Sequence, residues 1–132
     1  MMNDNDPFRG EIWLVDWSPS RGSEQSGMRP ALVVQTDAAS RNPRYPNVIV
    51  AAISTKGKDV PFHIPLAPED SNGLSENSWC KCEQILTISK DRLARRLGRI
   101  EDRLMQRIEE ALRLVLGLNT SNRSPKGKSV FL

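Results

Sequence analysis

Arg29 and Ser54 are two side chains whose chemistry suits them to act on a phosphate group. The guanidinium of Arg29 offers several N–H donors in a planar fork that matches phosphate oxygens, and Pro30 favours an extended backbone before it. Ser54 carries a hydroxyl that can donate to a phosphate oxygen without adding charge. Taken alone, each has an ordinary alternative, a surface arginine in a loop and a strand-end hydroxyl bonded to the backbone.

Two other side chains could transfer a proton. Glu24 is a carboxylate in a polar segment, where it could equally order the loop by pairing with Arg21 or with backbone N–H groups. His63 carries an imidazole, a common acid–base group, but a lone histidine between Pro61 and Pro65 is more typical of a surface side chain. The residue types alone leave the proton acceptor open.

The cysteine pattern argues against a metal site. Cys80 and Cys82 are separated by one residue, a spacing at which a disulfide would close a very tight ring, so we expect two reduced thiols. With His63 as the only histidine, the pair cannot complete a four-ligand zinc site without carboxylates or a second chain. The sequence therefore predicts neither a metal nor a cofactor.

The hydrophobic pattern predicts six or seven short strands that position these residues. Residues 10–17 are apolar on both faces, which indicates a barrel strand whose outer face is covered by a helix or by a partner subunit. Prolines alternate with apolar residues in 60–66, which is typical of an edge strand. The other expected strands are 31–35, 47–54, 78–88 as one or two strands, and 92–100.

One helix is expected after the last strand. Apolar residues recur at spacings of three and four, acidic residues occupy the first turn, and Gly117 is a natural stop. Residues 18–28 read as a mobile surface loop, and residues 39–46 as a turn. The helix residues are Glu101 and Asp102 in the first turn, then Leu104, Ile108, Ala111, Leu112 and Val115.

Together, the expected strands and helix predict a mainly β fold, a strongly bent antiparallel sheet or partly open β-barrel with a C-terminal α-helix. The length of 132 residues fits one domain, which we place at residues 8–117, followed by a flexible tail over 118–132. The hydrophobic fraction of 38% is modest, which makes a dimer plausible. A net charge of +3 weakly favours a polyanionic partner. We expect a cytoplasmic protein, because neither a membrane segment nor a signal peptide is visible.

Four blocks of sequence, in this order, form a specific combination. They are RGEIW at 9–13, GSEQSGMRPALVV at 22–34, VAAIS at 50–54 and CEQILTI at 82–88. With these blocks the chain resembles the MazF/PemK family of toxin ribonucleases over about residues 8–117. The resemblance implies an SH3-like barrel of the CcdB/PemK type, a homodimer, and a groove that binds single-stranded RNA.

The resemblance also implies a reaction without a metal. The neighbouring 2′-hydroxyl attacks the scissile phosphate, giving a 2′,3′-cyclic phosphate and a 5′-hydroxyl end. Arg29 matches the catalytic arginine and Ser54 a Thr or Ser position of the family, with adjacent Thr55 as the alternative match. Arginine is a poor base, so Arg29 is expected to stabilise charge and donate to the leaving oxygen, while Glu24 sits at a position proposed to accept the proton.

Several other residues are expected to contact RNA. Ser23, Gln25 and Gln84 offer groups that can read base edges, and Thr55 and His63 are further candidates. Of the tryptophans, we assign Trp13 and Trp17 to the core or an interface, while Trp79 could stack on a base. A basic ridge, expected to be mostly a solvated face, comprises Arg92, Arg95, Arg96, Arg99, Arg103 and Arg107.

Three functions follow from the resemblance and the fold. The first is an RNA interferase acting on mRNA, tRNA or rRNA and held inactive by a cognate MazE-like antitoxin with an acidic, disordered segment. The second is a non-enzymatic toxin of the same barrel type that poisons DNA gyrase by binding, as CcdB does. The third is an RNA-binding module that has lost cleavage. Arg29, Ser54 and the GSEQ loop favour the ribonuclease.

Overall fold

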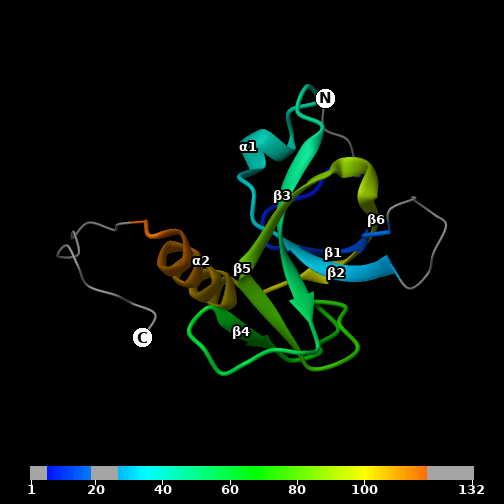
Figure 1. Cartoon of the computed structure of the whole chain (residues 1–132). Helices are drawn as coiled ribbons and strands as arrows, with labels where there is room; N and C mark the ends of the chain where they lie inside the picture. The colour runs from blue at the N-terminus through cyan, green and yellow to red at the C-terminus, as the bar shows by residue number, and fades with distance from the viewer. Residues whose placement is uncertain (1–5, 19–26, 119–132) are drawn as a thin grey trace.

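The described part of the chain is built on one six-stranded antiparallel sheet (Figure 1). The structure is a computed structural model that describes residues 6–18 and 27–118. The strands lie in the order β4-β5-β3-β2-β1-β6, so β4 and β6 form the edges. The strand bounds are β1 Glu11–Asp16, β2 Met28–Val33, β3 Asn47–Ser54, β4 His63–Leu66, β5 Ser78–Ser89 and β6 Leu93–Arg99.

Both faces of β1 are buried, as its sequence predicts. Ile12 is fully buried in one apolar cluster, which also contains Ile108 and Ala111 of the C-terminal helix. Trp13 and Val15 belong to a second cluster on the opposite face. The helix therefore covers one of the two apolar faces, because successive side chains of a strand point to opposite sides of the sheet.

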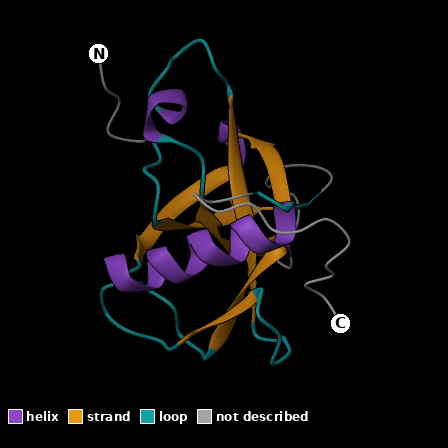
Figure 2. Ribbon diagram, turned by 90° about the vertical axis from the view of Figure 1, so that its left-hand side faces the viewer, coloured by secondary structure: helices purple, strands orange, loops and turns teal. Residues whose placement is uncertain are grey.

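The C-terminal helix, α2 Asp102–Leu116, confirms the predicted periodicity. It lies across one face of the sheet, where it contacts β4 and β5 (Figure 2). Gly117 ends it in the left-handed conformation, with a φ of 68°, and the N–H of Leu118 returns to the carbonyl of Arg113 at 2.9 Å. None of the described helices is long and apolar enough to cross a membrane.

A mainly β fold with a C-terminal helix and an edge strand at β4 is thus confirmed. Two short helices were not predicted: the 3-10 helix η2 Lys90–Arg92, and α1 Asp37–Ser40, which overlaps the start of the turn expected over 39–46. Ser40 is buried there, its hydroxyl accepts from the side-chain amide of Gln35 at 3.1 Å, and its carbonyl accepts from Lys90 at 2.7 Å. The contact with Lys90, which is fifty residues away, could not be read from local pattern.

The ladder between β2 and β3 is short, and this shapes the site. Ala31, Leu32 and Val33 pair with β3, whereas Met28 to Pro30 pair only with β1. The proline at position 30 has no N–H to donate, so it suits the point where the ladder to β3 has not begun. Beyond the pair Ala31 and Ala52, the two strands end side by side without a ladder between them.

β5 is a single strand with a pronounced irregularity. Ala51 of β3 pairs with Ile85, but the next residue, Ala52, pairs with Lys81, so residues 82–84 stand between two consecutive β3 partners. Extra residues on one strand bend it and redirect its side chains. The first part of β5 also pairs with β4, from His63 opposite Lys81 to Leu66 opposite Ser78.

Candidate active site

A groove of about 720 Å³ opens where the β2–β3 ladder stops. Its walls come from the start of β2, the end of β3 with the residues after it, the loop before β5, and β5 on both sides of its irregularity. The lining residues include Trp17, Arg29, Pro30, Ala52, Ser54, Thr55, Lys56, Leu74, Glu76, Lys81, Gln84 and Leu86.

Arg29 and Ser54 both line this groove. The paired residues Ala31 and Ala52 set the register, and Arg29 and Ser54 each lie two residues beyond that pair on their own strands. Residues separated by two on a strand share a face, so the register directs both side chains to the same side of the sheet. Arg29 is exposed and Ser54 half-buried.

The hydroxyl of Ser54 keeps its proton available. Its Oγ accepts a hydrogen bond from the backbone N–H of Lys56 at 3.1 Å. A hydroxyl that accepts in this way still has its O–H to donate. The ordinary alternative, a strand-end hydroxyl bonded to backbone, therefore holds in the structure and is compatible with a bond from Ser54 to a phosphate. Thr55 is exposed and lines the same groove.

Among the other predicted residues, Gln84 is exposed and lines the groove beside Arg29 and Ser54. Ser23, Glu24 and Gln25 lie outside the described residues. Trp79 is half-buried and packs against the backbone of Gly57, where an added Cβ would come within 2.2 Å of the Trp79 Cγ atom.

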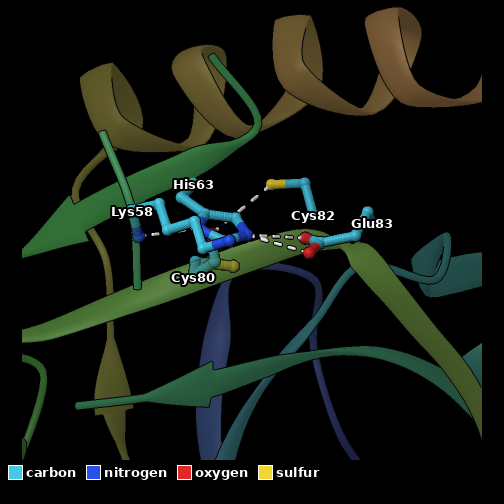
Figure 3. A network of polar contacts seen from close by, with 5 residues as sticks. All are labelled: Lys58, His63, Cys80, Cys82 and Glu83. Carbon is cyan, nitrogen blue, oxygen red and sulfur yellow. Dashed lines mark hydrogen bonds and ion pairs between the residues drawn. The ribbon is translucent and has the colours of Figure 1, made fainter. Parts of the chain in front are cut away.

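His63 corrects a sequence-based expectation. It is buried, with 7% of its surface exposed, and is not a surface side chain that could contact RNA. Its Nδ1 accepts from the backbone N–H of Lys58 at 3.0 Å, and its Nε2 lies 2.8 and 3.0 Å from the two carboxylate oxygens of Glu83 (Figure 3). The residues that follow β3 fold over this face of the edge strand, which the local proline pattern cannot reveal.

Three charged groove residues were not singled out from the sequence. Lys56 and Lys81 add positive charge near Arg29, and Glu76 is the only carboxylate among the described residues that line the groove. One signal could have indicated Lys81: it lies between Cys80 and Cys82, which are buried, so alternation directs it to the opposite face. Lys56 and Glu76 lie in loops, where no periodicity indicates orientation.

The tryptophan and arginine expectations are mostly confirmed. Trp13 is 5% exposed and donates to Glu11 at 3.0 Å, while Trp17 packs on the second apolar cluster and also lines the groove.

Two arginines of the basic ridge, Arg92 and Arg96, make contacts within the protein. Arg92 donates to the carbonyls of Asp16 and Ser18, and Arg96 lies over the Trp13 ring at 5.0 Å and pairs with Glu11 at 2.9 Å. The remaining ridge residues are exposed, namely Arg95, Arg99, Arg103 and Arg107.

Cys80 and Cys82 are free thiols, both fully buried in the cluster beneath α2. The hydrogen bond with Cys82, together with burial, raises the pKa of the Cys80 thiol well above its usual value. Within the described residues, no three His, Cys, Asp or Glu side chains gather in a group that could hold a metal ion. The two thiols therefore act as small apolar core residues.

Comparison with known proteins agrees with this fold. Residues 8–116 match the family described as PemK-like, MazF-like toxin of type II toxin-antitoxin system. Endoribonuclease MazF of Staphylococcus saprophyticus is 38% identical over 115 residues, which cover 85% of this chain and 92% of that relative.

Solved structures show the same fold. An endoribonuclease from a mycobacterial species is 25% identical, with a TM-score of 0.70, and covers 89% of this chain and 96% of its own. An endoribonuclease in complex with its cognate antitoxin, also mycobacterial, is 25% identical with a TM-score of 0.69. The match covers 86% of this chain and 98% of that endoribonuclease. MazF from Deinococcus radiodurans shares the fold, with 22% identity and a TM-score of 0.66. The match covers 84% of this chain and 96% of that protein. The predicted CcdB/PemK-type fold and the family resemblance are confirmed, and the chain belongs to the PemK-like, MazF-like toxins of type II toxin-antitoxin systems.

Proposed function

We propose that this toxin is a metal-independent endoribonuclease that cuts single-stranded RNA in the groove described above. The observation that carries the proposal is that Arg29 and Ser54 come from two strands and line one groove. The relatives named as endoribonucleases support the same activity and do not favour the alternative of a toxin that poisons gyrase.

In the proposed reaction, the 2′-oxygen of the nucleotide before the cut attacks phosphorus, and the bond from phosphorus to the 5′-oxygen breaks. The products are a 2′,3′-cyclic phosphate and a 5′-hydroxyl. Arg29 neutralises the charge that develops on the phosphorane, and Ser54 donates to a nonbridging oxygen. The nucleophile belongs to the substrate, so the protein has to align it, stabilise charge and handle two protons.

Glu24 is the proposed acceptor of the 2′-hydroxyl proton, and Arg29 donates to the leaving 5′-oxygen. Because Glu76 lies in the groove, it is the acid to compare with Glu24. If Glu24 is the base, Glu24→Gln abolishes cleavage while Glu76→Gln leaves it nearly intact. The opposite result would assign the proton transfer to Glu76.

Contacts to RNA are proposed for residues of the groove and for two residues outside the described part of the chain. Ser23, Gln25, Thr55 and Gln84 would read base edges, which single-stranded RNA leaves accessible. Lys56 and Lys81 would neutralise backbone phosphates on either side of the cut. His63 is left out of this set, because it is buried and its ring nitrogens already have partners.

The proposed partners are a second copy of the chain, mRNA, tRNA or rRNA as the target, and a cognate antitoxin. One mycobacterial relative was solved in complex with its cognate antitoxin, which supports such a partner for this toxin. An acidic antitoxin segment would compete with RNA for the positive charges of the groove. We place the activity in the cytoplasm, and the toxin domain at residues 8–117 with the remainder as a tail.

The test is cleavage of a defined RNA in EDTA, with the new ends identified by mass spectrometry. We expect cyclic phosphate and 5′-hydroxyl ends, and loss of cleavage in Arg29→Ala. Arg107→Ala is the matched control, because Arg107 is an exposed arginine on α2 and does not line the groove. Cleavage that requires Mg²⁺ and leaves 5′-phosphates would refute the mechanism.

A further inference from the structure

The contacts of the buried His63 ring with Lys58 and Glu83 define which ring nitrogen carries the proton. A backbone N–H can only donate, so the Nδ1 atom that accepts from Lys58 at 3.0 Å carries no proton. The proton of the neutral ring is then on Nε2, which donates to the Glu83 carboxylate at 2.8 Å. In a doubly protonated ring Nδ1 would also be a donor, and two N–H groups would then face each other at this contact. The contacts therefore select the neutral form.

The two partners of His63 lie in two different segments that each contribute residues to the groove. Lys58 lies in the segment that follows Ser54, the segment that contributes Thr55 and Lys56 to one wall. Glu83 lies in the irregularity of β5, between Lys81 and Gln84, which line another wall. Lys58, His63 and Glu83 do not themselves line the groove.

The segments that contain Lys58 and Glu83 lie outside the β3–β5 ladder. Residues 82–84 stand between two consecutive β3 partners, so the β3 ladder does not set the conformation of Glu83 and Gln84. The segment after Ser54 has left the ladder altogether; it is held by the bond from Lys56 N–H to Ser54, by packing of Gly57 on Trp79, and by the bond from Lys58 to His63. His63 is the residue whose side chain contacts both segments, beside the backbone hydrogen bond from the N–H of Cys82 to the carbonyl of Phe62 at 2.9 Å.

The burial pattern agrees with a bracing role. The side chain of Glu83 is 36% exposed, whereas that of His63 is 6% exposed. His63 also sits directly opposite Lys81 in the β4–β5 ladder, with the Phe62 ring at an edge-on distance of 5.3 Å. A buried ring with fixed neighbours on several sides has little freedom to rotate, so it can transmit the position of one wall to the other.

We propose that His63 and Glu83 form a positioning pair in which the neutral imidazole joins the segment after Ser54 to the bend of β5, so that Ser54 and Gln84 act on the same RNA. The inference rests on the proposed ribonuclease function. The pair touches neither the reacting atoms nor the substrate. Loss of the pair removes the side-chain link that aligns the two segments, and a misalignment of about 1 Å can lower the rate about 100-fold.

Kinetics of two Glu83 variants separate positioning from charge. Glu83→Ala removes the acceptor, and we expect kcat to fall by about 100-fold with KM little changed, because Arg29, Lys56 and Lys81 still bind RNA. In Glu83→Gln the side-chain carbonyl still accepts from Nε2, so kcat recovers to near that of the unmodified protein. Glu110→Ala, an exposed carboxylate on α2, is the matched control.

Two kinetic outcomes would overturn the proposal. If Glu83→Gln is as inactive as Glu83→Ala, Glu83 acts through its charge or as a proton carrier. If Glu83→Ala cuts RNA as fast as the protein without the substitution, the two walls do not depend on the contact between His63 and Glu83. Circular dichroism is used to choose a temperature at which each variant is folded. If Glu83→Ala does not fold at any temperature, Glu83→Gln and the spectrum described next decide the question.

The tautomer can be observed directly, because His63 is the only histidine of the chain. A long-range ¹H–¹⁵N spectrum of the intact protein at neutral pH contains one imidazole, and we expect protonated Nε2 with unprotonated Nδ1. A doubly protonated ring, or a proton on Nδ1, would contradict the brace. Absence of RNA cleavage in the unmodified protein would refute the ribonuclease proposal instead, while the spectrum would still test the pair.

Discussion

Arg29 and Ser54 lie at matching steps beyond the last pair of the β2–β3 ladder, each two residues past Ala31 and Ala52. The ladder stops there, and the groove opens at the same place. A continued ladder would bring the strands to within about 5 Å and close the space between them. The end of hydrogen bonding thus creates the site, and the register directs the guanidinium and the hydroxyl to one face.

Ser54 and Thr55 are predicted to differ sharply as alanine variants. Removal of one donor to a transition-state oxygen costs about 100-fold or more in kcat, so Ser54→Ala should lose at least that much. Thr55→Ala should cut at a rate close to the unmodified one, because Thr55 is placed at a base contact. Single-turnover cleavage of one short RNA measures both, and the reverse order would show that Thr55 supplies the donor.

The lysines of the groove are predicted to set the salt dependence of RNA binding. Each phosphate contact to a single strand contributes about 0.7 to the slope of log K against log salt. Lys56→Ala and Lys81→Ala should each lower that slope by about this amount. Binding is measured with an uncleavable RNA carrying a 2′-deoxynucleotide before the cut. Arg103→Ala serves as the control, and an equal change there would show that the whole surface attracts RNA.

Ile108 is predicted to be the residue of α2 whose truncation costs most stability. It is fully buried in the cluster that joins α2 to β1 and β4. Ile108→Ala should lower the free energy of unfolding by about 2 to 5 kcal/mol, measured in urea. The exposed neighbour Arg107→Ala should change it by about 0.5 kcal/mol or less. Equal effects would mean that α2 does not pack on the sheet as described.

The two cysteines are predicted to resist labelling while the protein is folded. Both are fully buried, and the hydrogen bond with Cys82 together with burial raises the pKa of Cys80, so this thiol stays protonated and unreactive at neutral and mildly alkaline pH. A chromogenic disulfide reagent should react with both thiols in denaturant and with neither before unfolding. Rapid reaction of the folded protein would show that the face beneath α2 opens.

Local sequence pattern was sufficient to predict the elements whose side chains repeat with a helix or strand period. The helix periodicity from Leu104 to Val115 and the stop at Gly117 produced α2 where it was expected, and the apolar alternation of residues 10–17 produced a strand buried on both faces. These features depend on side chains within one turn or one pleat of each other, so neighbouring residues contain the information. The motifs around Arg29 and Ser54 likewise indicated the family without coordinates.

The position of His63 was decided by residues far from it in the chain. Its partner Glu83 is twenty residues away, and the segment that covers it comes from the end of another strand. Whether a side chain of an edge strand faces water depends on what folds over that strand, and no local spacing encodes this. The end of the β2–β3 ladder, the bend of β5 and the inclusion of Lys81 in the groove depend in the same way on pairing between distant strands. The sequence by itself therefore determined the chemistry available and most of the elements, whereas only the tertiary structure decided which side chains share the groove, because distant segments must pack together before that space exists.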